Sequence, residues 1–354
     1  MRLAHVFGIA NFLLGYEARQ DREGLAEDVV AVVRKHLSER APTPPSPPSQ
    51  REVGKLFVSP PPTGWGSERG WGTFAVRAKR ADKSFPENSQ EIERRVGAAI
   101  AEATGLRVDL EHPDLTVHIE IVERTAFVLL EKSEGPGGLP VGVSGRVLAL
   151  LSSGFDSPVA SWRMMRRGCI VDFIHFHSYP YTSDASIRNV EEIVRVLQPW
   201  QQERGRLHLV SLIDYQKAVM TEAPAALRVL LYRRMMVRVA ERIARQLGAE
   251  ALVTGENLGQ VASQTIPNMA VVEVVAERPV FRPLLGYDKL EIIREAEMIG
   301  TAAISTRPYD DCCSLFTPTH PSTRARGGDL DAAEAVLGAG EWVERLVASA
   351  EQRL

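Results

Sequence analysis

The sequence predicts an α/β protein in which a parallel-sheet domain follows a small α+β domain. From residue 146 onward, short apolar segments alternate with segments of helical periodicity, which is typical of alternating strands and helices. Residues 73–132 instead combine strand-like segments of alternating polarity with a single helical segment. The length of 354 residues also exceeds the roughly 150 residues of one ordinary domain.

The first 50 residues predict one strand, one helix and a linker. Residues 6–12 (VFGIANF) are apolar enough for a strand, and Leu25 and Val29 lie at helical spacing in a predicted helix, Asp21–Leu37. Prolines and serines crowd residues 41–50, which indicates an extended linker. Because one strand and one helix cannot bury a core alone, this segment packs on another domain or lacks a partner upstream.

Two series of elements follow. In the small domain the sequence predicts strands at 73–80, 115–122 and 126–132, and a helix from Asn88 or Ser89 to Ala103. In the larger domain it predicts strands at 146–153, 169–177, 206–212 and 251–255, helices at Pro158–Arg167, Ile187–Leu197 and Lys289–Ile299, and further helices up to residue 247. These larger-domain strands are nearly continuous in apolar residues, which favours a parallel sheet with helices on both faces. Active sites in such sheets lie at the carboxyl ends of the strands.

Composition and charge exclude several classes of protein. Hydrophobic residues make up 44% and charged residues 25%, so a disordered or fibrous chain is excluded. The net charge is −3, so any nucleic-acid surface must be a local cluster of cations. We see neither an apolar run long enough for a transmembrane helix nor a secretory signal. Three cysteines, two of them adjacent, make a poor disulfide framework, so we expect a cytoplasmic protein without membrane contact.

Residues 152–157 (SSGFDS) carry the most specific chemical signal. Ser152, Ser153 and Gly154 follow a strand and let the backbone turn tightly. Ser157 lies near the start of the next helix, where N–H donors and the helix dipole favour phosphate. The sequence has neither a Walker loop nor a G-x-S-x-G elbow. A plain strand-to-helix turn is the alternative interpretation.

This loop resembles the SGGxDS loop of the PP-loop ATP pyrophosphatases, whose domain is adenine nucleotide alpha hydrolase-like. Ser153 stands where that family usually has glycine, and a serine is costly there if the position needs a positive φ. Segments resembling the tRNA 4-thiouridine synthetases, also called tRNA uridine 4-sulfurtransferases, occur in order at 171–183, 231–244, 251–265, 282–293 and 307–324. Upstream segments resembling that family's THUMP domain, the exit from it and the end of its N-terminal ferredoxin-like domain are 74–100, 135–145 and 6–12.

The resemblance implies four consecutive segments. They are a partial ferredoxin-like segment with the linker (1–50), a THUMP RNA-binding domain (51–145), a PP-loop sulfurtransferase domain (146–325) and a C-terminal helical tail (326–354). It also implies that the chain begins partway through the family's N-terminal domain. We expect the short form of the family, without a rhodanese domain.

The implied activity is ATP-dependent sulfur transfer that makes 4-thiouridine at position 8 of tRNA. Uridine is expected to be adenylated with ATP and Mg²⁺, and sulfur to come from a protein persulfide or directly from a cysteine desulfurase. The resemblance further implies a homodimer and sulfur transfer to the carrier protein of thiamine thiazole synthesis. Two alternatives stay open: thiolation of the carrier without tRNA, and an RNA-binding protein with an impaired loop.

The resemblance also implies particular site residues. The expected nucleotide-binding residues are Leu150, Leu151, Ser152, Ser153, Gly154, Ser157, His175, Phe176, Arg233, Gly255 and Gln264. Arg233 can fork onto a phosphate, and Gly255 permits close backbone approach. Asp156 is expected to orient Mg²⁺ or to hold the loop, and Lys289 to contact ATP or the activated intermediate. We predict no metal site built from protein side chains.

Cys312 and Cys313 lie in a polar segment between prolines, which favours exposed and reactive thiols. By resemblance this element takes part in sulfur transfer, and we favour Cys313 over Cys312 as the sulfur carrier. Cys169 opens an apolar strand and is expected in the core. An iron–sulfur site formed by all three cysteines is the weaker alternative.

Four cations, Arg77, Lys79, Arg80 and Lys83, lie close together beside one acid. Arg77 and Lys79 share a strand face, and alone this pattern indicates a solvated strand. Because the segment resembles a THUMP domain, we expect it to contact tRNA phosphates. Such a domain would recognise the acceptor end of tRNA by shape and backbone.

Overall fold

The computed structural model describes residues 5–9, 11–39, 72–81, 83–123, 125–310, 312, 316 and 321–354. The chain forms two compact units, one of Asn11–Glu134 and one of Met1–Ala10 with Gly135–Leu354. The linker predicted at 41–50 lies outside the described residues. The domain boundaries expected at residues 50, 145 and 325 stay a prediction.

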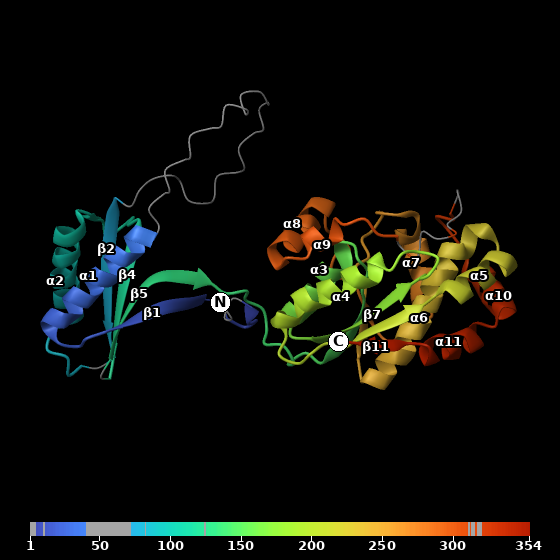
Figure 1. The fold of residues 1–354 in the computed structure, drawn as a ribbon, viewed down its shortest axis with the longest axis horizontal. Coiled ribbons are helices and arrows are strands. Elements are labelled where there is room, and N and C mark those ends of the chain that lie inside the picture. Colours follow the sequence, from blue (N-terminus) through green and yellow to red (C-terminus); the bar gives the residue numbers. More distant parts are fainter. Residues whose placement is uncertain are drawn as a thin grey trace, which may run out of the picture. The chain divides into compact units, whose positions relative to one another are not determined.

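The first unit is a five-stranded sheet with two helices on one face. Its strands, in the spatial order β1-β5-β4-β2-β3, are β1 (Asn11–Ala18), β5 (Thr125–Glu134), β4 (Leu115–Val122), β2 (Thr73–Arg80) and β3 (Arg107–Val108). The helices are α1 (Arg22–Glu39) and α2 (Ser89–Thr104), and both pack their apolar stripes on the same face (Figure 1). This arrangement confirms the predicted α+β unit.

Local sequence explains the α2–β4 core. Asn88 caps α2, since its side chain accepts from the Glu91 N–H while the Glu91 carboxylate accepts from the Asn88 N–H. Gly105 ends the helix with a left-handed φ of 75°. Along β4, every second residue from Leu115 to Ile121 is buried, as the alternation predicts.

The strand predicted at residues 6–12 is wrong in position. Strand β1 begins at Asn11, and residues 5–9 belong to the other unit. There Phe7 is buried against Trp162 and Trp200, at ring-centroid distances of 5.6 and 5.2 Å. Gly8 turns the chain with a φ of 91°. The apolar character at Phe7 therefore reflects an aromatic contact, whereas Asn11 and Phe12 do pair as the start of β1.

The second unit is a six-stranded sheet between two helical layers. Its spatial order is β10-β9-β6-β7-β8-β11, and all neighbours are parallel except β11, which runs antiparallel to β8. The strands are β6 (Arg146–Leu150), β7 (Ile170–His177), β8 (Leu207–Ser211), β9 (Ala251–Val253), β10 (Val280–Phe281) and β11 (Glu351–Arg353). The parallel-sheet fold class is confirmed.

The sheet separates the two helical layers (Figure 1), and a hydrophobic cluster fills the space between the sheet and each layer. One face carries α3 (Asp156–Arg166), α4 (Ala185–Leu197), α8 (Lys289–Ile299) and the short α9 (Ala302–Ser305). The other carries α5 (Ile213–Glu222), α6 (Arg228–Leu247), α7 (Ile266–Glu273), α10 (Gly327–Leu337) and α11 (Ala339–Ala348). Among the described residues, no helix is both long and apolar enough to cross a bilayer.

Candidate active site

The site lies where the direction of chain progression reverses in the parallel sheet. From β6 the chain proceeds to β7 and β8 on one side, whereas β9 and β10 lie on the other. In such sheets the crevice at this point binds ligands. A cavity of about 330 Å³ opens there, within the range of small-molecule sites. The predicted site residues that line it are Leu150, Leu151, Ser152, Ser153, Gly154, Asp156, Ser157, His175, Phe176, Arg233, Gly255, Gln264 and Cys312.

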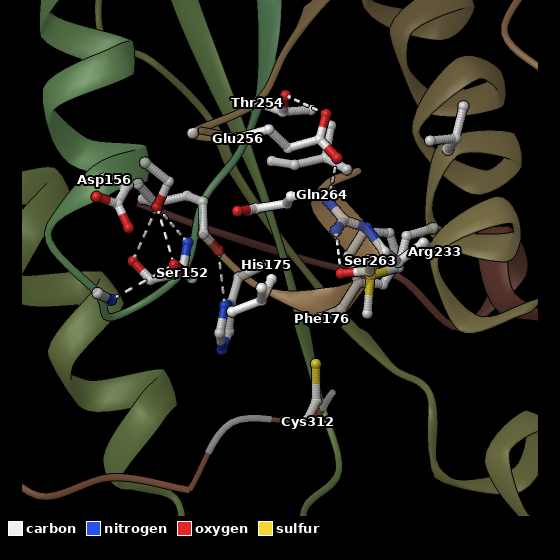
Figure 2. Close-up of a pocket in the computed structure, with 18 of the residues that line it drawn as sticks. Ser152, Asp156, His175, Phe176, Arg233, Thr254, Glu256, Ser263, Gln264 and Cys312 are labelled. Atoms are coloured by element: carbon white, nitrogen blue, oxygen red, sulfur yellow. Dashed lines mark hydrogen bonds and ion pairs between the residues drawn. The ribbon is translucent and has the colours of Figure 1, made fainter. Parts of the chain in front are cut away.

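The serine loop between β6 and α3 is closed by its own side chains (Figure 2). Ser157 Oγ accepts from the Ser152 backbone N–H at 2.8 Å and lies 3.0 Å from Ser152 Oγ. The Gly154 N–H donates to Ser152 Oγ at 3.4 Å. These bonds hold the loop as one turn at the N-terminus of α3, where the helix dipole favours an anion.

Ser153 causes no backbone strain. The positive-φ residues in the described part of the chain do not include it, so the loop does not demand glycine at this position. Its side chain is fully buried, and Ser153 Oγ donates to the Ser186 carbonyl at 3.1 Å. The serine thus ties the loop to the first turn of α4.

His175 braces the loop from β7. Its Nδ1 lies 2.9 Å from the Leu151 carbonyl oxygen, and its Nε2 lies 3.4 Å from Ser186 Oγ. A carbonyl only accepts, so Nδ1 carries a proton and donates to Leu151, whereas Nε2 shares a hydrogen bond with the serine hydroxyl. The imidazole is therefore occupied in holding the protein, and Phe176 beside it presents its ring to the cavity (Figure 2).

Arg233 is held by groups that sequence reasoning missed. It forms an ion pair with Glu256 and donates to Ser263 Oγ at 2.8 Å (Figure 2). Arg282 also pairs with Glu256, at 2.7 Å. Burial opposes ionisation of Glu256, but the two guanidinium groups outweigh it and hold its pKa below the ordinary value. The position of Glu256, directly after the predicted Gly255, was the available signal.

Gly255 is required by packing against the serine loop. A Cβ at this position would lie 2.5 Å from the Ser157 backbone nitrogen and 2.8 Å from the Asp156 carbonyl carbon. The close approach seen at Gly255 is between two protein segments, and its role in nucleotide binding stays a prediction.

Asp156 and Lys289 contact each other. Lys289 Nζ lies 2.7 and 2.9 Å from the two carboxylate oxygens of Asp156, and it lies over the Phe155 ring at 5.4 Å. Gln260 Nε2 donates to the same carboxylate at 3.4 Å. Asp156 holds the first turn of α3 to the start of α8, whereas Lys289 is not among the residues that line the cavity.

The expectation of an exposed Cys312 is wrong. Its side chain is buried at 8% exposure, and its sulfur points toward the cavity near Phe176 (Figure 2). The polar sequence misled because Cys312 itself packs in the apolar cluster on the α5–α6 face. Cys313 lies outside the described residues. Cys169 is in the core as predicted, and burial raises its thiol pKa.

Gln264 gives the cavity an unused hydrogen-bond acceptor. Its side-chain oxygen is buried and has no hydrogen-bond partner among the described residues. Buried polar atoms are rarely left unpaired, so this oxygen indicates a ligand that donates a hydrogen bond. The serine loop, an arginine, the buried amide oxygen of Gln264 and a thiol thus line one cavity.

The predicted RNA-binding cations lie on and after β2 in the first unit. Arg77, Lys79 and Lys83 are exposed. Arg77 donates to the Leu110 carbonyl at 2.7 Å, and the half-buried Arg80 donates to the Phe85 carbonyl at 3.0 Å.

A doubly covered parallel sheet with a serine-rich loop before α3 defines the PP-loop class of α/β proteins. The family profile described as thiamine biosynthesis protein (ThiI) matches residues 142–337, more than half of the chain, and the THUMP domain profile matches residues 52–131. The chain belongs to the ThiI family.

Curated relatives are called probable tRNA sulfurtransferases. The relative from Thermus thermophilus is 51% identical over 72% of this chain and 63% of its own length. The relative from Caldanaerobacter subterraneus subsp. tengcongensis is 43% identical over 92% of this chain and 77% of its own length. The chain thus spans less than two thirds of the Thermus protein that it matches.

One solved structure matches almost the whole chain. It is described as a crystal structure of a 4-thiouridine synthetase–RNA complex with bound ATP. It is 35% identical, covers 99% of this chain and 84% of its own, and has a TM-score of 0.86. The chain is therefore similar in fold to that 4-thiouridine synthetase.

Proposed function

We propose that this protein is an ATP-dependent tRNA sulfurtransferase that makes 4-thiouridine, at position 8 of tRNA. The observation that carries the proposal is the cavity in which a phosphate-type serine loop and the Cys312 sulfur lie together. Relatives called tRNA sulfurtransferases and a neighbour with bound ATP and RNA support it.

The proposed chemistry has two displacement steps. Uridine O4 attacks the α-phosphorus of ATP, pyrophosphate leaves, and the O4–P bond makes AMP the leaving group. The terminal sulfur of a persulfide then attacks C4, and AMP departs with O4. A neighbouring cysteine or an external thiol cleaves the resulting C4–S–S linkage, which leaves 4-thiouridine and a disulfide to be reduced.

The protein side chains have distinct proposed roles. The loop of Ser152–Ser157 binds phosphate oxygens at the α3 N-terminus, and Arg233 steadies the phosphates from α6. Gln264 Oε1 accepts from the adenine amino group. The backbone around Leu150, Leu151, His175 and Phe176 lines the base and ribose positions.

We propose that Mg²⁺ enters with ATP. The described residues contain no cluster of three histidine, cysteine or acidic side chains that could bind a metal by themselves. Mg²⁺ is usually held by one or two carboxylates together with substrate phosphates, and Asp156 in the loop fits that mode. Lys289, which pairs with Asp156, would neutralise this carboxylate until the metal arrives.

For sulfur delivery we propose that Cys312 and Cys313 divide the carrier and resolving roles, with Cys313 as carrier. A cysteine desulfurase supplies the persulfide, and the sulfur carrier of thiamine thiazole synthesis is a second acceptor. The cations Arg77, Lys79, Arg80 and Lys83 contact tRNA phosphates. We also propose a cytoplasmic homodimer.

The test is reconstitution. Unmodified tRNA is incubated with the protein, Mg-ATP, a cysteine desulfurase and cysteine, and its nucleosides are measured by mass spectrometry. Wild type is expected to form 4-thiouridine, whereas Cys313→Ser is expected to form none. Product from Cys313→Ser but not from Cys312→Ser would move the carrier role to Cys312. No product from wild type with tRNA bound would reject the proposed function.

A further inference from the structure

Gln216 on α5 links Cys312 to Ser178, the residue that follows the end of β7. The side chain is fully buried, and both ends of its amide are used. Its Nε2 donates to the Cys312 carbonyl at 2.7 Å, and its Oε1 accepts from Ser178 Oγ at 2.6 Å. These three residues are far apart in sequence, with Gln216 lying 38 positions from Ser178 and 96 from Cys312.

The strand end that Gln216 binds is also the edge of the nucleotide cavity. Ser178 directly follows β7, and His175 and Phe176, near the end of that strand, form part of the cavity wall. Ser178 is itself fully buried. The amide therefore links Cys312 to the strand that forms the wall facing the nucleotide.

Removing Gln216 takes away a buried hydrogen bond to the Cys312 carbonyl. A buried carbonyl that loses a donor carries a desolvation penalty, which favours movement of Cys312 toward water. Cys312 would then leave the cavity while the serine loop, which makes its own hydrogen bonds, stays in place.

We infer that Gln216 is a positioning residue for sulfur transfer: its amide fixes the backbone of Cys312 so that the Cys312 sulfur faces the nucleotide cavity. The effect on sulfur transfer rests on the proposed function, whereas the hydrogen bonds of Gln216 do not depend on it. Activation of the substrate uses the serine loop, whereas delivery of sulfur uses Cys312, so a change at Gln216 should affect only delivery.

The first test measures thiol reactivity without tRNA. In a Cys313→Ser background the chain retains two thiols, and their alkylation by iodoacetamide is followed by peptide mass spectrometry. Gln216→Met keeps the side-chain size but removes both hydrogen bonds. We expect alkylation of Cys312 to accelerate about tenfold, whereas buried Cys169 stays unreactive.

Gln201, which contacts the same strand β7, offers a matched control. Gln201 is also a buried amide that bonds backbone at both ends, to the Val171 N–H and carbonyl at 3.0 and 3.1 Å. Gln201→Met should leave Cys312 reactivity unchanged. If Gln216→Met does not fold, Ser178→Ala removes only the outer hydrogen bond and should give a smaller acceleration in the same direction.

The second test measures coupling in the complete reaction with both cysteines present. We expect Gln216→Met to release pyrophosphate near the wild-type rate but to form about tenfold less 4-thiouridine per pyrophosphate. Unchanged Cys312 reactivity, acceleration of Cys169 in parallel, or unchanged coupling would each overturn the inference. Absence of 4-thiouridine from wild type would instead reject the proposed function, and the alkylation result would still decide whether Gln216 fixes Cys312.

Discussion

Gly255 is the residue at which one added methyl group would disturb the loop most directly. Its Cβ would lie 2.5 Å from the Ser157 nitrogen, and backbone cannot move aside cheaply. We predict that Gly255→Ala weakens ATP binding about tenfold or more, as measured by equilibrium titration. Gly286→Ala is the control, because nothing lies within 4 Å of its Cβ position. Equal affinities for the two variants would contradict this packing role.

Glu256 should be required for the stability of the site and for its pH dependence. Glu256→Gln removes the carboxylate shared by Arg233 and Arg282, which should cost about 3 kcal/mol of unfolding free energy at neutral pH. Because the folded pKa lies below the ordinary 4.5, the stabilisation is present above that pH and is lost as the pH falls below it. Urea unfolding followed by tryptophan fluorescence should show the wild-type advantage narrowing below pH 4.5, and an advantage independent of pH would disprove the assignment.

Most cavity residues could be predicted because they occur in short contiguous motifs that resemble those of a known family. The serine loop was found from its own residues, whereas Gly255 was implied by the resemblance, and both line the cavity. Glu256 and Gln216 could not be assigned in this way, since their roles depend on partners such as Arg282 and Cys312. Burial of Cys312 was missed for the same reason, because local polarity does not reveal a long-range apolar contact.

At the scale of elements, Asp172 joins the starts of neighbouring strands. It is fully buried on β7 and pairs with Arg146 of β6 at 2.8 Å and with Arg206, just before β8, at 2.9 Å. Asp172→Ala would leave two arginines without their shared carboxylate, at a cost of about 3–5 kcal/mol. ATP affinity of the folded protein should not change, because the cavity lies at the opposite ends of the strands.

The control for Asp172→Ala is a substitution of Glu203, an exposed acid that pairs with the same Arg146. Glu203 pairs with Arg146 from the surface, so Glu203→Ala should cost about 1 kcal/mol or less. Chemical unfolding of both variants measures the difference. Similar losses would show that burial does not set the strength of this network.

The bounds of helices and strands are predicted most accurately where a regular apolar pattern extends over many residues. The α8 bounds, Lys289–Ile299, were predicted from the sequence because charged residues border a regular apolar stripe. Strand β11 was missed, since its exposed residues Glu351–Arg353 carry no apolar pattern and pair only through backbone with β8. The segment at residues 6–12 was misplaced because apolar composition does not distinguish a strand from an aromatic anchor.

At the scale of the whole molecule, the cations of β2 should control salt-dependent tRNA affinity. Arg77 and Lys79 are exposed on one strand, so the double variant Arg77→Gln/Lys79→Gln should reduce the slope of log affinity against log salt by about 0.7–0.9 per lost phosphate contact. Filter binding over a salt series measures this slope. Arg34→Gln/Lys35→Gln on α1 changes the same net charge and should leave the slope unchanged.

We propose that the cavity activates uridine O4 with ATP before sulfur arrives. An ¹⁸O label at uridine O4 tests this order of steps. Unmodified tRNA carrying ¹⁸O at uridine O4 is incubated with the protein, Mg-ATP, a cysteine desulfurase and cysteine. Mass spectrometry of AMP and of the tRNA nucleosides then follows the oxygen and the sulfur together. The account predicts one ¹⁸O-labelled AMP for each 4-thiouridine formed. AMP without label, or pyrophosphate release that does not depend on tRNA, would contradict it.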